Sequence, residues 1–147
     1  IEDVLASRAI SYPLTLGMCS PIGDGAAACL VVSEKLAQRL GGGRAVKVRA
    51  SVLHSGWDYA DGEPNVTEVV VKDAYERAGV GPEDLDVVEL HDASAPAELI
   101  YYETLGLCPK GEGARFVNEG HSRLGGKTPV NPSGGLLRKG HPVGATG

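Results

Sequence analysis

Two histidines in this sequence lie where an imidazole could be aimed at a substrate. His91 and Asp92 follow an apolar run at residues 85–90 that is typical of a buried strand, and ligands of α/β proteins collect beyond the carboxyl ends of strands. His141 stands in a Gly-His-Pro turn, whose proline restricts the backbone. A histidine fixed in this way suits general acid or base chemistry. The same turn also fits a histidine that only bonds a loop carbonyl, and the spacing alone leaves both interpretations open.

Glycines surround His141 and predict close approach of other groups to the backbone. The chain has 21 glycines, and 11 of them follow Leu105. They include the run Asn131-Pro-Ser-Gly-Gly135 and the two glycines near the histidine, Gly140 and Gly144. Backbone without a Cβ can lie against a ligand or against another segment. Both glycine segments are therefore candidates for a functional site.

Residue patterns of several common active sites do not occur in the sequence. No dinucleotide fingerprint, Walker lysine or GxSxG elbow is present. The histidines lack the short helical spacing of metal ligands, so we expect no metal. Cys19, Cys29 and Cys108 form no CxxC pair, which fits a reducing, cytoplasmic compartment. His54 and His121 have no supporting motif, and we expect them to be structural or solvent-exposed.

The composition excludes further classes of protein. The chain has 147 residues, a formal net charge of −5, 42% hydrophobic residues and 22% charged residues. These values fit one globular domain rather than a disordered segment. No apolar run reaches the roughly 18 residues of a spanning helix, so we expect no membrane span. The acidic balance disfavours nucleic acid, whose phosphates call for a basic surface.

The elements that would position the histidines alternate between strands and helices. Apolar or alternating runs predict strands, and runs bounded by a capping residue and a glycine predict helices. The alternation indicates an α/β layered domain, with the glycine-rich segment 106–128 as a long loop. The expected strands are 21–32, 45–52 and 85–90; the expected helices are 33–40, capped by Ser33, 65–78, capped by Asn65 or Thr67, and 96–106, with Pro96 near its start.

The most specific motif of the chain joins the two glycine segments. Asn131-Pro-Ser-Gly-Gly-Leu-Leu-Arg-Lys-Gly-His-Pro-Val-Gly-Ala-Thr-Gly147 closely resembles the thiolase signature, in which NxxGG leads into GHPxGxxG. His91-Asp-Ala-Ser94 stands where thiolases carry an Asn/His-Glu-Ala-Phe loop, which is HDCF in the sterol-carrier-protein type. Residues 13–15, 18–28 and 103–108 are also similar to that branch, so the resemblance extends over nearly the whole chain.

The resemblance implies an α/β fold, namely the C-terminal half of the thiolase fold. That fold is an αβαβα layered sandwich, in which this half contributes a mixed five-stranded sheet. Residues 1–40 would be the end of the N-terminal half, with its last strand and a linker helix. Residues 41–147 would be the C-terminal domain, cut after the GHPxGATG motif. The nucleophilic cysteine would lie in the N-terminal half, outside this chain, and we expect the isolated chain to be inactive.

The resemblance also implies an acyl-CoA-handling acyltransferase that breaks or forms a carbon–carbon bond of a 3-ketoacyl-CoA in lipid or sterol metabolism. His141 would be the base for the nucleophilic cysteine, and His91 would contribute to an oxyanion hole. No covalently bound cofactor is expected, coenzyme A would be part of the substrate, and the full-length protein would be a homodimer. The loop that binds substrate or oxyanion would comprise Asn131, Ser133, Gly134, Gly135, Gly140 and Gly144.

The sequence departs from the sterol-carrier-type loop at Ala93 and Ser94, where that branch has a cysteine and an aromatic residue. Related thiolase-fold proteins without the catalytic cysteine pair act in lipid transfer, or as retro-aldolases on steroid side-chain CoA esters. The retro-aldolases work with a small OB-fold partner protein and use tyrosine chemistry. Tyr101 and Tyr102 are the alternative acid–base residues here, although helical tyrosines more often belong to a core or an interface. A non-catalytic interaction module is a third interpretation.

Overall fold

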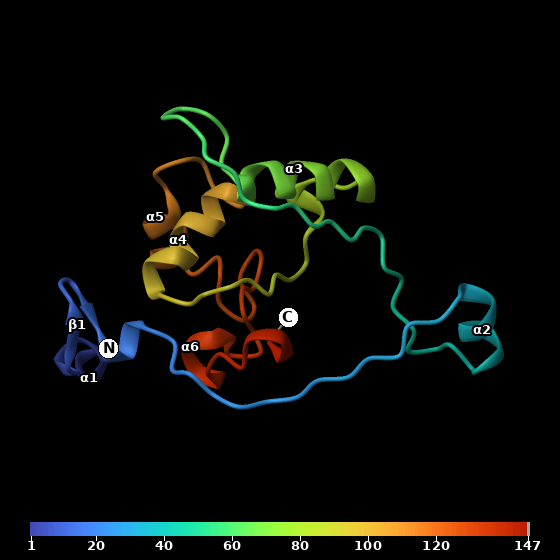
Figure 1. The fold of residues 1–147 in the computed structure, drawn as a ribbon, viewed down its shortest axis with the longest axis horizontal. Helices are drawn as coiled ribbons and strands as arrows, with labels where there is room; N and C mark the ends of the chain where they lie inside the picture. Colours follow the sequence, from blue (N-terminus) through green and yellow to red (C-terminus); the bar gives the residue numbers. More distant parts are fainter. Residues whose placement is uncertain (147) are drawn as a thin grey trace.

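The computed structural model describes residues 1–146, so Gly147, the last residue of the thiolase-like motif, lies outside the described residues. The described chain contains short helices and one small sheet (Figure 1). The elements are α1 Glu2–Ala6, β1 Ala9–Ser11, β2 Leu14–Thr15, the 3-10 turn η1 Leu16–Met18, α2 Glu34–Arg39, α3 Val66–Ala78, η2 Pro82–Asp84, α4 Ala95–Thr104, α5 Gly113–Asn118, α6 Gly135–Lys139 and η3 Val143–Ala145. Among residues 1–146, each helix is too short or too polar to cross a bilayer.

The three helices expected from the sequence are present, and their capping explains where they begin. Asn65 Oδ1 accepts the N–H groups of Thr67 and Glu68, and the Glu68 side chain accepts the N–H of Asn65, which completes a capping box at the start of α3. Gly79 ends α3 with a φ of 64°, a left-handed conformation that glycine adopts without strain. Ser33 caps α2 through its hydroxyl oxygen, which accepts the Leu36 N–H at 3.3 Å.

The strands expected from the sequence do not form a sheet. In residues 1–146 the only sheet is the antiparallel pair β1–β2. Residues 21–32 and 45–52 run as irregular chain, with Leu30 80% and Val46 91% exposed, so the prediction of strands there is wrong. A strand is stabilised when a neighbour pairs with its backbone over several residues, and within residues 1–146 the one bridge in these two segments joins Ile22 to His141. The five-stranded sheet stays a prediction.

The third expected strand, 85–90, forms one backbone pairing with another segment but, within residues 1–146, is not part of a sheet. Val88 pairs in parallel with Val130, donating its N–H to Pro129 and accepting the N–H of Asn131. This contact lies at one side of the hydrophobic core, between α4 and α5. Tyr75 of α3 donates its hydroxyl proton to the Leu105 carbonyl at 2.7 Å, which ties α3 to the same body. The buried core residues are Val88, Tyr102, Leu107, Cys108, Phe116 and Val130.

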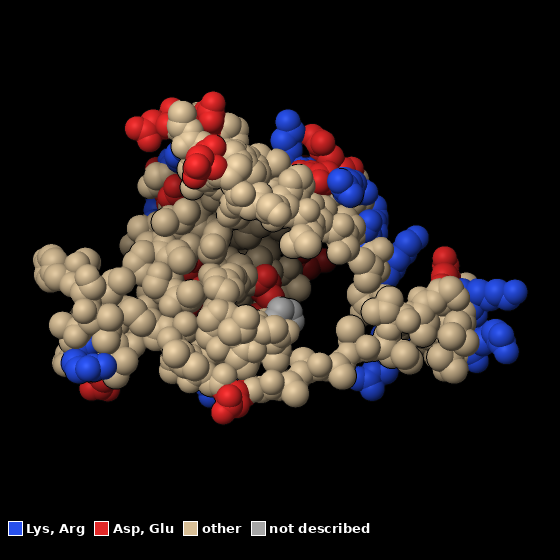
Figure 2. Space-filling model, in the orientation of Figure 1, with Lys and Arg blue, Asp and Glu red and all other residues tan. Residues whose placement is uncertain are grey.

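The segment 106–128 is not a plain loop, because it contains α5. Phe116 on this helix is 4% exposed and packs its ring against Tyr102 of α4 at a centroid distance of 5.2 Å. Figure 1 shows α3 to α6 gathered into one body, whereas α2 stands apart at the end of two long connections. In the space-filling view, open space separates the arm that carries α2 from this body (Figure 2). The candidate residues therefore depend on the body for their positions.

Candidate functional site

The two candidate histidines lie side by side. The ring centroids of His91 and His141 are 4.8 Å apart, and the ring planes make an angle of 79°, an edge-to-face arrangement. Their sequence positions are 50 residues apart (141 − 91), so the fold alone brings them together. His91 is exposed and His141 is half-buried, so one ring faces solvent beside another that the protein partly covers.

The backbone of His141 is held by a segment from far earlier in the chain. Its N–H donates to the Pro21 carbonyl at 2.8 Å, and the residue pairs in parallel with Ile22. Gly140 precedes it with a φ of 84°, which allows the chain to turn there and to lie against Pro21. Thr146 Oγ1 lies 3.5 Å from His141 Nδ1. These contacts hold the backbone at His141 and place the Thr146 hydroxyl beside its imidazole.

The loop that carries His91 rests on the same early segment. The Ser20 N–H donates to the Ala93 carbonyl at 2.9 Å, and Cys19 pairs with Ser94. Residues 19–22 thus contact both histidine loops through backbone hydrogen bonds. The predicted strand at 21–32 did not form, yet its first two residues hold the His141 loop, and the two residues before it hold the His91 loop.

Asn131 closes the turn between the core and α6. Its φ of 48° is in the left-handed region that asparagine tolerates better than most residues. Its N–H donates to Val88 O, and its Oδ1 accepts the Leu90 N–H, both at 2.8 Å. The Asn131 Nδ2 atom is buried and has no hydrogen-bond partner within residues 1–146. A buried amide donor without a partner is uncommon and marks a place where a substrate or water oxygen would bind favourably.

Ser133 and the glycines around α6 differ in how closely they are packed. Ser133 is exposed, and its hydroxyl donates to Glu89 Oε2 at 2.7 Å while accepting from Lys139 Nζ at 2.8 Å. Gly134 and Gly135 have φ values of 106° and 60°, which a side chain would strain. Gly144 is exposed, and no atom of the described residues 1–146 lies within 4 Å of the position of an added Cβ, so these residues show no close approach there.

Asp92 is a buried residue that the sequence pointed to beside His91 but to which it assigned no role. It is 2% exposed, and its Oδ1 accepts the Leu136 N–H of α6 at 2.6 Å. A Cβ added at Gly135 would overlap both carboxyl oxygens, so only glycine leaves room for this side chain. The signal in the sequence was an acidic residue directly after a buried strand, next to a candidate histidine.

The two tyrosines proposed as alternative acid–base groups lie in the body around α4. Tyr102 is 2% exposed, its hydroxyl donates to Glu98 Oε1, and burial raises its pKa far above the ordinary value of 10.0. A tyrosine that holds its proton this firmly is a poor base near neutrality, which favours a structural role. Tyr101 is half-buried on the same helix. Burial also raises the pKa of Glu98, with a smaller contribution from the negative charge of Asp92.

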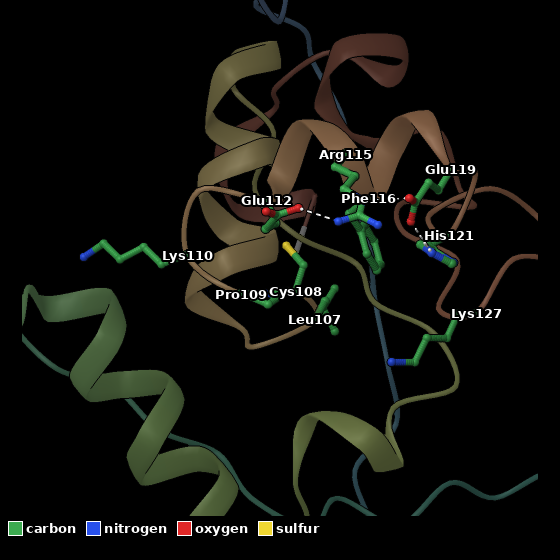
Figure 3. A pocket seen from close by; sticks show the side chains of 10 residues that line it. All are labelled: Leu107, Cys108, Pro109, Lys110, Glu112, Arg115, Phe116, Glu119, His121 and Lys127. Atoms are coloured by element: carbon green, nitrogen blue, oxygen red, sulfur yellow. Dashed lines mark hydrogen bonds and ion pairs between the residues drawn. The ribbon is translucent and has the colours of Figure 1, made fainter.

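A separate pocket of about 380 Å³ opens beside α5, and none of the predicted site residues lines it (Figure 3). Arg115 bonds Glu119 at 2.7 Å and Glu112 at 3.5 Å, and this cation holds the pKa of Glu119 below its usual range. His121 Nε2 lies 3.1 Å from Glu119 Oε2, and the His121 ring packs on Phe116. His121 therefore makes structural contacts at this pocket, away from the paired histidines.

Comparisons with known proteins agree with the motif. A model of the thiolase C-terminal domain-like family matches residues 57–146. The chain is 47% identical to "Benzoylsuccinyl-CoA thiolase subunit BbsB" of Thauera aromatica, covering 100% of the chain and 39% of that protein. It is 40% identical to "Sterol carrier protein 2" of Homo sapiens, covering 100% of the chain and 28% of that protein. The chain thus spans less than half the length of these curated relatives.

A solved structure has a similar fold. The chain superposes on "Ltp2-ChsH2(DUF35) aldolase" with a TM-score of 0.69 and 25% sequence identity, over 92% of this chain and 38% of that one. The aligned relatives include thiolases, sterol carrier proteins and an aldolase, so the likeness is one of family rather than of a single activity. The family model covers more than half of the chain, from residue 57 to residue 146. The chain therefore belongs to the thiolase C-terminal domain-like family.

Proposed function

We propose that the full-length protein breaks or forms a carbon–carbon bond of an acyl-CoA substrate by thiolase-type chemistry, with His141 as the general base. The observation that carries this proposal is the pair of imidazoles 4.8 Å apart, at two motifs separated by 50 residues in sequence. One imidazole can accept a proton while the other faces a developing negative charge. A single histidine bonded to a loop carbonyl would not require this arrangement.

The chemistry assigns a different role to each group. A cysteine from the N-terminal half supplies the nucleophile, and its thiol proton passes to the His141 imidazole, which acts as the general base. The thiolate attacks the 3-keto carbon, the C2–C3 bond breaks, and the electron pair leaves on the carbon next to the CoA thioester, which then takes up a proton. Coenzyme A thiol finally attacks the acyl-enzyme and releases a shortened acyl-CoA.

Two donors support the negative oxygens of these steps. His91 faces the space beside His141, and fixed donors at a developing oxyanion are among the largest contributions to such catalysis. Asn131 Nδ2 is a buried donor with no partner among residues 1–146, so it supports an indirect role through a bound water or a substrate oxygen. Gly134, Gly135 and Gly140 let the backbone approach the acyl-CoA.

The substrate class comes from the relatives. A thiolase subunit named for benzoylsuccinyl-CoA and an acetyl-CoA acetyltransferase are both similar to this chain, so we propose a 3-ketoacyl-CoA with coenzyme A as part of the substrate. We further propose that residues 1–40 belong to the N-terminal half, that residues 41–147 are the C-terminal domain, and that the full-length protein is a homodimer. No covalently bound cofactor is part of this proposal.

A second candidate is retro-aldol cleavage with a small OB-fold partner protein. It is favoured by Ala93 and Ser94, which replace the cysteine and the aromatic residue of the sterol-carrier-type loop, and by the structural likeness to an aldolase. Tyr101 is then the more suitable acid–base tyrosine, because Tyr102 is buried and bonded to Glu98. Thiolysis consumes coenzyme A and retro-aldol cleavage does not, which separates the two in one assay.

Steady-state kinetics of three histidine variants in the full-length protein test the proposal. His141→Ala is expected to lower kcat by roughly 10²- to 10⁴-fold, the contribution of a positioned acid or base. His91→Ala is expected to have an intermediate effect, because it removes an oxyanion donor rather than the base. His121→Ala is the matched control, since this ring packs on Phe116 at the separate pocket, and turnover should stay within a few-fold.

The assay uses acetoacetyl-CoA, a longer 3-ketoacyl-CoA and benzoylsuccinyl-CoA as substrates for thiolysis, and a 3-hydroxyacyl-CoA as the substrate for retro-aldol cleavage, each with and without coenzyme A. Circular dichroism confirms that each variant is folded. A folded His141→Ala protein with near wild-type kcat would contradict the thiolase-type mechanism. Cleavage of the 3-hydroxyacyl-CoA to a carbonyl product and a shortened acyl-CoA, without added coenzyme A, would favour the retro-aldol alternative instead.

A further inference from the structure

We infer that Asp92 is a positioning residue that sets the geometry of the two histidines by fixing the start of α6; this inference rests on the proposed function. The carboxyl group is 2% exposed, one residue after His91. Its Oδ1 accepts the Leu136 N–H at 2.6 Å. A buried carboxylate is costly unless it is bonded, so this contact must contribute enough to keep the side chain inside.

Two hydrogen bonds connect one histidine loop to the other through this side chain. The first runs from the Leu136 N–H to Asp92, and the second runs from the Gly140 N–H to the Leu136 carbonyl at 2.9 Å. Gly140 directly precedes His141, and Asp92 directly follows His91. A shift of Asp92 therefore moves the beginning of α6 and, through its single turn, the base itself.

The packing around Asp92 leaves this carboxyl group little freedom. A Cβ at Gly135 would overlap both carboxyl oxygens, so the glycine backbone and the carboxyl group are in close contact. The backbone on the other side is also held, because Ser20 donates to the Ala93 carbonyl. By contrast, the second link to the same turn, from Glu89 to Ser133, lies in exposed surroundings. The buried hydrogen bond between Asp92 and Leu136 is therefore the contact that can fix the distance between the two histidine loops.

The effect on the reaction follows from how steeply rate depends on geometry. A misplacement of about 1 Å between reacting groups can cost on the order of 100-fold in rate, while binding through remote contacts is little changed. Asp92→Leu keeps the branched shape of the side chain, although leucine is bulkier, and removes the acceptor, so kcat should fall by roughly 10- to 100-fold, with KM within about 3-fold. Asp92→Asn keeps a neutral oxygen as a weaker acceptor, and a fall of roughly 3- to 10-fold in kcat is expected.

A double-mutant cycle with His141 distinguishes positioning from general support of the fold. If Asp92 acts through His141, then Asp92→Leu and Asp92→Asn should each lower kcat by less than about 2-fold further in a His141→Ala background. A purely structural residue would cause the same loss in both backgrounds. Asp86→Leu and Asp86→Asn are the matched controls, because Asp86 is exposed on the same segment, and their kcat should equal that of the wild type.

The outcomes separate the inference from the function on which it rests. If His141→Ala leaves kcat unchanged, the proposed function fails and the inference fails with it. If His141→Ala abolishes most turnover but Asp92→Asn retains wild-type kcat, or if the losses at the two sites multiply, only the inference is overturned. Should Asp92→Leu not fold, the Asn cycle decides alone, since Asn has nearly the shape of Asp.

Discussion

The body formed by α3 to α6 and the arm formed by residues 26–48 both contain apolar runs, but only the body buries them. In the body, Val88 is 9% exposed because Val130 pairs with its backbone and α4 and α5 cover its side chain. In the arm, Val46 and Val48 alternate with polar residues as a strand would, and they are 91% and 70% exposed. An alternating pattern shows which side of a segment is to be buried, but it does not supply the neighbour.

The difference also separates helices from strands. A helix satisfies its backbone groups within its own segment, so α2 forms in the arm although none of its residues is buried. A strand forms its backbone hydrogen bonds with another segment. The arm therefore keeps its helix and loses its strands, and this contrast can be tested by matched substitutions in the two regions.

The largest difference in the free energy of unfolding is expected between two leucine-to-alanine substitutions, one in the body and one in the arm. Leu107 is 7% exposed in the core, whereas Leu30 is 80% exposed in the arm. In the 147-residue chain, Leu107→Ala should lower the free energy of unfolding by about 2–5 kcal/mol, because it leaves a cavity. Leu30→Ala should change it by less than about 0.5 kcal/mol. Urea unfolding followed by circular dichroism measures both, and equal effects would show that the arm packs in solution.

The elements that were predictable from the sequence are those whose signals are local. Asn65 and Gly79 mark the two ends of α3, and the structure confirms both. Each acts on backbone groups a few residues away, so no knowledge of the rest of the fold is needed. The strand predictions at 21–32 and 45–52 failed because pairing is a property of two segments. The short helix α5 was missed in a glycine-rich stretch, although the i, i+4 pair of Arg115 and Glu119 was a usable signal.

In the candidate site, too, the local features could be predicted from the sequence and the long-range ones could not. His91 and His141 could be chosen from their motifs, because each motif fixes its own turn. Their distance of 4.8 Å could not be read from either motif, since it depends on Pro21, on α6 and on Asp92. Asp92 was noted beside His91 without a role, because a carboxylate after a strand fits an exposed cap as readily as a buried link. Burial, which distinguishes the two, is a property of the whole body.

A smaller effect is expected from removing one helix cap in each region. Asn65→Ala removes the acceptor of two N–H groups and breaks the capping box of α3, which should cost about 1 kcal/mol of the free energy of unfolding. Ser33→Ala removes the single cap bond of α2, a helix of six residues without a buried residue. It should lower helix content slightly and leave the unfolding midpoint unchanged. A shift of the midpoint by Ser33→Ala would mean that α2 folds together with the body.

A pH-dependent effect is expected at Glu98, where burial raises the pKa of the carboxyl group above its ordinary value of 4.5. The folded protein then binds the proton more tightly than the unfolded chain. The protonated Glu98 side chain stabilises the fold fully below pH 4.5, and this stabilisation is lost as the pH rises through the raised pKa. Glu98→Gln cannot lose a proton and still offers an oxygen to Tyr102. The variant should therefore be more stable than the wild type at neutral pH, and the difference should shrink toward pH 4.5.

The smallest change in stability is expected for Glu103→Gln on the same helix, α4. Its sign is opposite to that of the change expected for Glu98→Gln. Backbone hydrogen bonds from Gly111 and Gly113 lower the pKa of this carboxyl group, and the Gly113 N–H lies 3.0 Å from Glu103 Oε1. Its contribution is present above pH 4.5 and is lost as the pH falls through the lowered pKa, so Glu103→Gln should be less stable than the wild type at neutral pH. Solvent around this carboxylate screens the interaction and keeps the effect small. Urea unfolding at pH 3.5, 5 and 7 compares the variants; if Glu98→Gln and Glu103→Gln shift stability in the same direction at neutral pH, burial does not distinguish the two ends of α4.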